Sequence, residues 1–320
     1  MAPSVPVVEA HGVSKMAFVA RHPVSAYFAL TFAISWGCAL LAIGGSGGMQ
    51  GTTPSSDPRF VYAVIAMLAG PSLTGILLTA FIYGRAGLRA LLSRLVAWRV
   101  SPVWYAVALL TGAAVMTPTL LVLSSTSAAF LPGIITSDHK TSLVLVSLAV
   151  GLSAGVFEEL GWTGFAIPTL RRRYGIVATG LIVGIWWSAW HLFPNVWSSR
   201  AASGELPMSV FLTATGFSVF VGYLTAFRVL MVWVYDHTKS LLVAMLMHLS
   251  FTASLLILNP LNISGAHLLT YSFALAAAMW GVISVIATVG DRRCTDESRS
   301  GLTTPARERV IHGKNPHRAT

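Results

Sequence analysis

Long apolar runs dominate this sequence and restrict the folds that it can adopt. Of its 320 residues, 55% are hydrophobic and only 10% carry a charge, and the mean hydropathy is +0.71. A water-soluble core cannot absorb so much apolar surface, whereas each helix that crosses a bilayer needs about 20 apolar residues. We expect about eight transmembrane helices, at residues 24–44, 60–83, 103–123, 142–170, 175–193, 207–227, 240–258 and 266–289. The sequence therefore predicts an all-α, polytopic membrane helix bundle.

The sequence outside these runs indicates three parts and one further helix. We expect a cytoplasmic N-terminal tail at residues 1–23, a membrane domain at 24–290, and a disordered basic tail at 291–320. Within the membrane domain, the segment Gly84–Arg99 places four leucines on one helical face, interspersed with four arginines. This pattern predicts an amphipathic helix that lies in the membrane interface and contacts anionic lipid. A gate for substrate is the alternative role for this segment.

The basic residues predict how the chain is oriented in the bilayer. With the N-terminus placed inside, all but three of the 21 Lys and Arg residues fall in inner segments, and the exceptions are Arg59, Lys140 and Arg200. Cytoplasmic loops carry such an excess, so we expect both termini to face the cytoplasm of a bacterial-type plasma membrane. The net charge is +10, but the basic residues lie between apolar runs rather than on one face, which argues against nucleic acid as a partner.

Small residues recur four positions apart on two of the predicted helices. Gly151 and Gly155 lie on one, and Gly180 and Gly184 lie on the next. This spacing lets helix backbones approach closely within lipid. Close helix contacts at these glycines are one interpretation, and the ordinary frequency of glycine in membrane helices is the other.

Two adjacent carboxylates, Glu158 and Glu159, lie inside the apolar run 142–170. A charged side chain at the centre of a bilayer costs about 2.5–3.5 kcal/mol on insertion scales, so such residues indicate a functional site by default. A helix end in contact with water is the alternative, although the apolar sequence continues to Pro168. Adjacent residues of an α-helix are about 100° apart, so the two carboxylates cannot face one point. We therefore expect one carboxylate to act chemically and the other to be structural.

Two histidines, His191 and His248, also lie within predicted helices. A lone histidine in a membrane helix is most often a packing residue, but here two of them occur on separate helices and the carboxylates occur on a third. We expect Glu158, His191 and His248 to line one polar cavity. Counting about 1.5 Å per residue places the three at unequal depths, so the run 175–193 must start below the membrane, tilt or break for them to meet.

Three short motifs, in this order and in this membrane setting, carry a resemblance. They are Glu158-Glu159 followed by Gly161-Trp162 and Gly164-Phe165, then Trp187 four positions before His191, then His248 with Phe251. Together they resemble the CAAX prenyl protease and bacteriocin-processing family, also called the Abi family of intramembrane peptidases, to which the type II CAAX prenyl endopeptidases belong. The resemblance covers about residues 60–255.

The resemblance implies an intramembrane endopeptidase that hydrolyses a peptide bond of a membrane-associated peptide or protein, with a CAAX-type substrate as one candidate. It implies that Glu158, beside Glu159, activates a water molecule as general base, and that His191 helps to hold this water. It further implies that His248 and Thr252 stabilise the oxyanion. Such roles agree with general acid–base chemistry and with the stabilisation of developing charge by aligned donors.

The chain departs from the family pattern at two positions. The first motif usually has an arginine four residues after its second glutamate, where this chain has Thr163, and the third motif usually has an asparagine where this chain has Thr252. Without an arginine at position 163, we expect Glu159 to be either neutral or paired with a donor from another helix. We also expect Glu159→Gln to be nearly neutral for folding.

Other chemistries and functions remain open from the sequence. A glutamate with two histidines is a known zinc ligand set, but here the three residues come from separate helices, and we favour glutamate chemistry without a metal cofactor. A non-proteolytic membrane protein of the same fold is one functional alternative. A proton-coupled transporter is another, although transporters commonly contain internal repeats and none is visible here.

Overall fold

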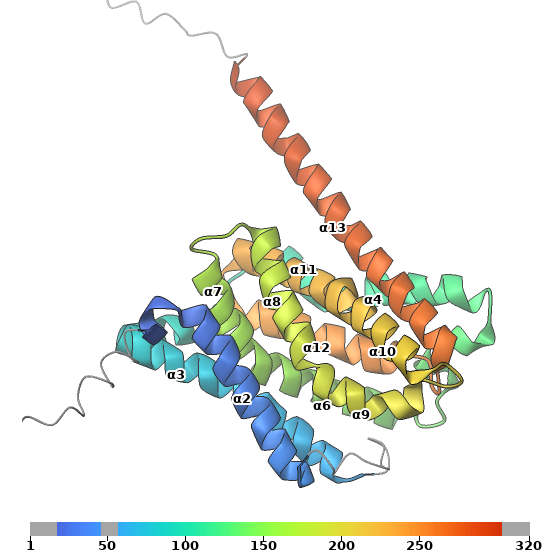
Figure 1. The fold of residues 1–320 in the computed structure, drawn as a ribbon. Coiled ribbons are helices and arrows are strands. Elements are labelled where there is room, and N and C mark those ends of the chain that lie inside the picture. The colour runs from blue at the N-terminus through green and yellow to red at the C-terminus, as the bar shows by residue number, and fades with distance from the viewer. Residues whose placement is uncertain (1–17, 46–56, 303–320) are drawn as a thin grey trace, which may run out of the picture. The chain divides into compact units, whose positions relative to one another are not determined.

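The computed structural model describes residues 18–45 and 57–302, and the regular secondary structure in these ranges is helical. Seven stretches are long and apolar enough to cross a bilayer, or up to eight if a bent pair counts as one span. They are α2 (Pro23–Ile43), α3 (Arg59–Leu95), α4 (Pro102–Ser124), Lys140–Leu170, Met208–Thr238, α12 (Leu241–Leu258) and Gly265–Thr288 of α13 (Gly265–Leu302). The predicted polytopic helical bundle is confirmed (Figure 1).

Two of these stretches contain a π-helical turn. The stretch Lys140–Leu170 consists of α6 (Lys140–Gly161), the π-helix η3 (Trp162–Ala166) and α7 (Ile167–Leu170). The stretch Met208–Thr238 consists of α10 (Met208–Phe217), the π-helix η4 (Ser218–Tyr223) and α11 (Leu224–Thr238). Two short helices precede α6, namely η2 (Ala128–Phe130) and α5 (Gly133–Thr136). The π-helix η3 directly follows the glutamate pair, which makes it part of the site described below.

The remaining span is broken, as the unequal depths of the candidate residues suggested. Helix α8 spans Ile176–Trp190, His191 is its C-cap residue, and α9 (Leu192–Ala202) begins directly after that histidine. The axes of Ile176–Trp190 and Leu192–Ser198 differ by 42°. The break therefore falls on a residue that the sequence singled out for chemistry.

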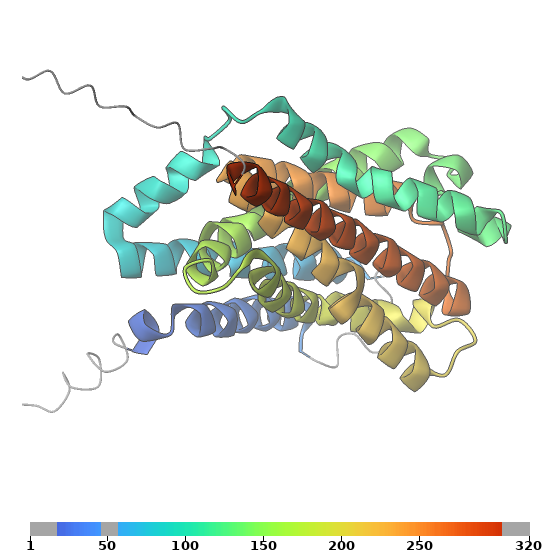
Figure 2. The same cartoon turned by 90° about the horizontal axis from the view of Figure 1, so that it is seen from above.

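Close packing of α6 against α12 and of α8 against α11 forms the centre of the bundle (Figures 1 and 2). A Cβ atom added to Gly155 would lie 2.6 Å from the carbonyl oxygen of Met245, and one added to Gly180 would lie 2.6 Å from the Cα atom of Val229. Real Cβ atoms essentially never come so close to a backbone atom. The glycines spaced four apart thus lie at close helix contacts, as the first of the two interpretations predicted.

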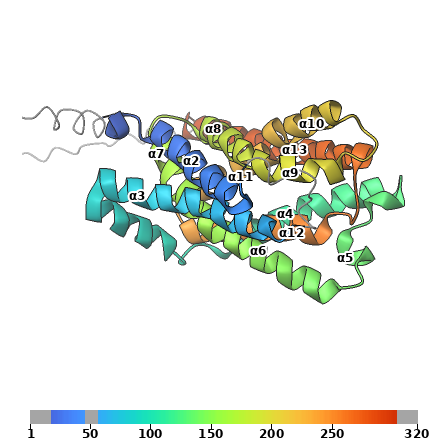
Figure 3. The same ribbon diagram turned by 60° about the horizontal axis from the view of Figure 1, so that its bottom comes forward.

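The predicted amphipathic segment exists, but part of its leucine face is buried in protein rather than in lipid. Gly84 (φ 59°, ψ −151°) breaks α3, and the second part of the helix folds back toward the bundle (Figures 2 and 3). In this second part Leu91 packs with Leu241 and Met245, whereas Leu92 is exposed. The segment is therefore docked on the helices that form the site.

The chain divides into two units, residues 1–280 and 281–320. The first contains all of the helices before α13 and every candidate site residue. In the second, helical backbone continues to Leu302, so the first part of the predicted disordered tail, 291–302, is helical. Most of the predicted N-terminal tail and residues 303–320 lie outside the described residues.

Candidate active site

Three helices bring the ionisable residues together inside the bundle. Glu158 and Glu159 lie in the last turn of α6, Arg228 lies on α11, and His248 lies on α12. Their exposed fractions are 3%, 0%, 0% and 2%, respectively. The alternative that the glutamate pair lies at an exposed helix end therefore does not hold. The close contact of α6 and α12 at Gly155 brings the end of α6 level with His248, because that glycine packs on Met245, one turn before the histidine.

Glu159 is held by donors from three separate segments. Nη1 of Arg228 lies 2.8 Å from each of its two carboxylate oxygens. Nδ1 of His248 lies 2.6 Å from Oε1, and the Thr163 hydroxyl, in η3, donates to Oε2. An ionised carboxylate only accepts hydrogen bonds, so the Nδ1 atom of His248 carries the proton in that contact. Of the two states expected for Glu159, the structure has the second, a carboxylate paired with a donor from another helix.

Glu158 has a more open environment than its neighbour. The indole Nε1 of Trp187, on α8, donates to its Oε2 over 2.6 Å. Its Oε1 lies 4.0 Å from Nε2 of His248, which is outside hydrogen-bond range. No other hydrogen bond to this carboxylate occurs within the described part of the chain. The imidazole of His248 therefore spans the two carboxylates, bonded to Glu159 and facing Glu158.

His191 adjoins this cluster through Trp187 rather than by a direct contact. Its ring packs edge-on against the Trp187 indole with 5.1 Å between the ring centres, and its Nδ1 lies 2.9 Å from the Trp187 carbonyl oxygen. Within the described residues no hydrogen bond joins His191 to Glu158 or Glu159. The structure thus brings Glu158 and His248 together and places His191 in contact with Trp187, the residue that donates to Glu158.

Thr252 lies one turn beyond His248 on α12 and is half-buried. It makes no hydrogen bond to the glutamates or to His248 in the part of the chain that the structure describes. Its role as a donor to an oxyanion is therefore not visible in the ground-state geometry, and it remains a prediction.

Arg228 is the site residue that sequence reasoning missed. It directly follows the predicted span 207–227, and the topology prediction therefore places it among the basic residues of an inner segment. The helix instead continues to Thr238, and the guanidinium lies inside the bundle, with its Cζ atom 4.1 Å from the centre of the Trp187 ring. One signal was present in the sequence, because an apolar run, Val229–Val234, resumes directly after the arginine. An arginine with apolar sequence on both sides needs a partner within the membrane.

The π-helix η3 connects the glutamate pair to a docked part of α3. Single π-helical turns occur often at functional sites, and this turn carries Thr163 and Gly164. The Gly164 carbonyl accepts a 2.9 Å hydrogen bond from Arg94, whose other terminal nitrogen donates to Tyr235 over 2.8 Å. A cavity of about 460 Å³ lies here between both parts of α3 and the segment Gly164–Arg172. The amphipathic segment is thus fixed to the first motif by Arg94.

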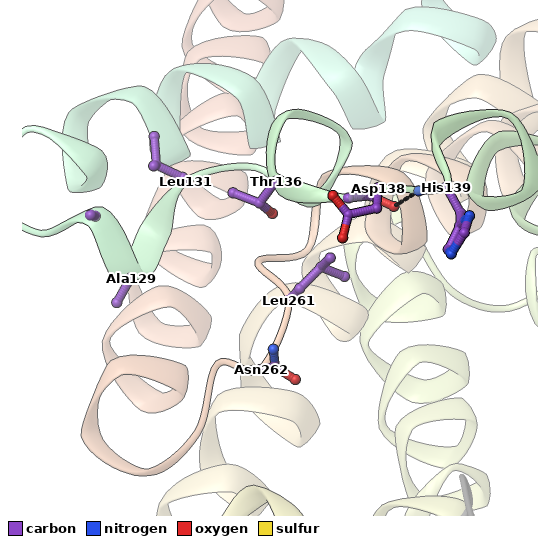
Figure 4. A pocket seen from close by; sticks show the side chains of 9 residues that line it. Ala129, Leu131, Thr136, Asp138, His139, Leu261 and Asn262 are labelled. Carbon is purple, nitrogen blue, oxygen red and sulfur yellow. Dashed lines mark hydrogen bonds between the residues drawn. The ribbon is translucent and has the colours of Figure 1, made fainter.

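A second pocket has a volume of about 400 Å³ (Figure 4). Asp138 and His139 line it together with Leu261 and Asn262 of the connection between α12 and α13. It adjoins the first residue of α6, whereas Glu158 lies in the last turn of that helix. This pocket therefore takes no part in the geometry of the glutamate pair.

Glu158, His191 and His248, the zinc ligand set that the sequence left open, are not grouped as metal ligands within the described residues. Both oxygens of Glu159 contact Arg228, and the Nδ1 atom of His248 is bonded to Glu159. Within the described residues no group of three or more His, Cys, Asp or Glu side chains is placed to hold a metal ion.

Comparison with known proteins connects this geometry to a family. Residues 140–254 match a family described as type II CAAX prenyl endopeptidase Rce1-like. The chain is also 40% identical over 55 residues to CAAX prenyl protease 2 of Methanococcus maripaludis, a stretch that covers 17% of this chain and 20% of that protein. The matched part thus spans about a fifth of the curated relative. The family match begins at the first residue of α6 and includes both glutamates, both histidines and Arg228. The resemblance read from the three motifs is thus confirmed over residues 140–254, which are similar to the Rce1-like family of type II CAAX prenyl endopeptidases.

Proposed function

We propose that this protein is an intramembrane endopeptidase that cleaves a membrane-associated peptide by means of a water molecule activated by Glu158. The observation that carries the proposal is the unequal environment of the two glutamates. Glu159 contacts Arg228, His248 and Thr163, whereas among the described residues Glu158 has one donor, Trp187, and its Oε1 faces His248 without a hydrogen bond. A carboxylate with a free oxygen beside an imidazole is suited to hold and deprotonate water.

The proposed reaction is a hydrolysis in which each proton is accounted for. Glu158 takes one proton from the water molecule while the water oxygen attacks the carbonyl carbon of the scissile bond, which gives a tetrahedral oxyanion. His248, held through Nδ1 by Glu159, presents Nε2–H to the oxyanion in its doubly protonated form, and Thr252 supplies a second donor. The proton on Glu158 then passes to the amide nitrogen, the C–N bond breaks, and a carboxylic acid and an amine are released; the acid loses its remaining water-derived proton to the amine, which leaves a carboxylate and an ammonium group.

The part of the reaction assigned to His191 is positional. Its ring packs on Trp187, and Trp187 donates to Glu158. In the proposal, His191 holds the water on the side of Glu158 that the indole leaves open. The description of the matched family supports a CAAX-type substrate, so the first probe is a farnesylated peptide that ends in a CAAX sequence, and an unprenylated membrane-tethered peptide is the second.

The test is peptide cleavage by the purified full-length protein in proteoliposomes, with wild type compared to Glu158→Gln. The amide keeps the shape of the side chain and can still accept from Trp187, but it cannot take a proton from water. We expect Glu158→Gln to lose cleavage while retaining its thermal unfolding midpoint, and Glu205→Gln, at an exposed position, to cleave like wild type. Cleavage by Glu158→Gln at the wild-type rate would refute the proposed base. A folded wild-type protein that cleaves neither probe would favour a non-proteolytic role.

We also propose that the reaction needs no metal cofactor, because Glu158, His191 and His248 are not grouped as metal ligands within the described residues. Cleavage should therefore continue in the presence of EDTA or 1,10-phenanthroline. Loss of cleavage on chelation, with recovery on addition of zinc, would overturn this part of the proposal and leave the peptidase assignment standing.

A further inference from the structure

Arg228 makes two contacts that connect it to both glutamates. Its Nη1 atom binds both oxygens of Glu159 at 2.8 Å, and its guanidinium lies over the ring of Trp187 at 4.1 Å. Trp187 in turn donates to Glu158, and Glu159 accepts from His248. Arg228 thus contacts Trp187, the partner of Glu158, and Glu159, the partner of His248.

We propose that Arg228 is a positioning residue that gives the two adjacent glutamates different roles. It holds Glu159 as an ionised anchor for His248, and it fixes the plane of the indole that binds Glu158. This inference rests on the proposed function for its catalytic part, whereas the ion pair itself is independent of that function. Arg228 touches neither the water nor the substrate in this scheme, and it acts through its two neighbours.

The geometry of Glu159 explains how this chain manages without an arginine at position 163. Thr163 already contacts Oε2 of Glu159 from the position one turn further along the chain. A guanidinium carried at position 163 would therefore meet the same carboxylate that Arg228 meets from α11. The two positions are alternative sources of one positive charge, and this chain takes that charge from α11.

Because Arg228 is buried, we expect the site to accept an arginine at position 228 or at position 163, but not at both. Its side chain is fully buried, and its Nε and Nη2 atoms have no hydrogen-bond partner among the described residues. A buried charge without a partner of opposite charge destabilises the folded protein, so each member of this ion pair depends on the other. A second arginine at position 163 would add an uncompensated charge, whereas the same arginine in a chain without Arg228 would restore the balance. The proposal thus predicts that the effect of Thr163→Arg changes sign with the residue at position 228.

The experiment compares wild type, Arg228→Met, Thr163→Arg and the double variant as full-length proteins in proteoliposomes. The readouts are the thermal unfolding midpoint and the kcat and KM for the farnesylated CAAX-type peptide. Arg171→Met, alone and with Thr163→Arg, is the matched control, because Arg171 pairs with Asp236 at a partly exposed site. Thr163→Arg should lower the midpoint both in wild type and in the Arg171→Met background, and should raise it only in the Arg228→Met background.

The kcat and KM values distinguish a positioning role of Arg228 from a purely structural one. Arg228→Met should lower kcat by about a hundredfold, the scale expected when reacting groups are displaced by about 1 Å, with KM changed less than threefold. The double variant should recover kcat at least in part. A wild-type kcat in folded Arg228→Met would overturn the positioning role of Arg228. A lower unfolding midpoint for Thr163→Arg in every background would overturn the inference that positions 163 and 228 are alternative sources of one positive charge.

Two outcomes that could confuse the test have their own readouts. If Arg228→Met does not accumulate, Glu159→Gln/Arg228→Met removes both charges, and its accumulation would support the pairing while its failure would contradict it. If wild type cleaves neither probe, the proposed function fails. The unfolding midpoints of the four proteins still decide whether an arginine at position 163 can replace Arg228 as the partner of Glu159.

Discussion

The indole Nε1 of Trp187 donates to Oε2 of Glu158 over 2.6 Å, while the same indole ring lies under the guanidinium of Arg228. The tryptophan thus joins the carboxylate proposed as base to the cation that holds the other carboxylate. A hydrogen bond to a charged group contributes about 1.5–3 kcal/mol, and here it also fixes which oxygen of Glu158 stays free. The position four before His191 therefore supplies a polar contact as well as packing.

Trp187→Phe tests that contact, because phenylalanine keeps an aromatic face for Arg228 and removes the N–H group. We expect kcat for the peptide probe to fall by roughly tenfold to a hundredfold, the kinetic equivalent of the hydrogen-bond energy above. Trp186→Phe is the control, since the Trp186 ring stacks on Phe28 at 5.1 Å. Equal kcat values for the two variants would show that the indole N–H does not orient Glu158.

Glu159→Gln should destabilise the protein, contrary to the nearly neutral effect expected from the sequence. The earlier expectation lacked the partner that the structure reveals, Arg228 at 2.8 Å. Removing one partner of a buried ion pair typically costs about 3–5 kcal/mol. The check is the free energy of unfolding in detergent, with the exposed Glu205→Gln expected within about 0.5 kcal/mol of wild type. A stability of Glu159→Gln equal to that of the control would mean that Glu159 is not ionised in the folded protein.

The fold was largely predictable because bilayer insertion depends on apolar length, which is visible in sequence. The contact between α6 and α12 was partly predictable from Gly155, but its partner Met245 was not, since spacing shows where a helix can be approached and not by what. Arg228 was missed for a related reason. A charged residue after an apolar run normally marks a helix end, and only the packing of α11 against α8 shows that this one lies inside.

Gly155→Ala should weaken packing in the centre of the bundle. A Cβ atom there would lie 2.6 Å from the Met245 carbonyl oxygen, so α6 and α12 must separate. Overpacking typically costs about 1–3 kcal/mol, and the shift would also move Glu158 relative to His248. Gly216→Ala is the control, because nothing lies within 4 Å of its added Cβ and alanine is the better helix former. The measurement is the unfolding midpoint, which should fall for the first variant and stay or rise for the second.

The orientation of the chain is open to direct labelling. The excess of basic residues in the predicted inner segments places residue 300 in the cytoplasm and residue 139 outside. Single cysteines at these positions, in a chain with Cys38 and Cys294 replaced by serine, would be treated with a membrane-impermeant maleimide on intact cells. We expect labelling at 139 and none at 300 until the cells are opened. The reverse pattern would invert the topology and place the docked part of α3 outside.

Thr252→Val tests whether the hydroxyl beyond His248 acts in the transition state. The substitution keeps the branched shape and removes the only donor of a half-buried side chain that makes no hydrogen bond to the cluster within the described residues. Stability should therefore change little.

If the hydroxyl donates to the oxyanion, it does so only after the carbonyl becomes tetrahedral, so the loss should appear in kcat and not in KM. Removing one oxyanion donor costs about a hundredfold to a thousandfold in kcat. Thr252→Asn, which returns the family residue with its longer N–H donor, should keep or raise kcat. An unchanged kcat in Thr252→Val would leave His248, held by Glu159, as the donor that the oxyanion requires.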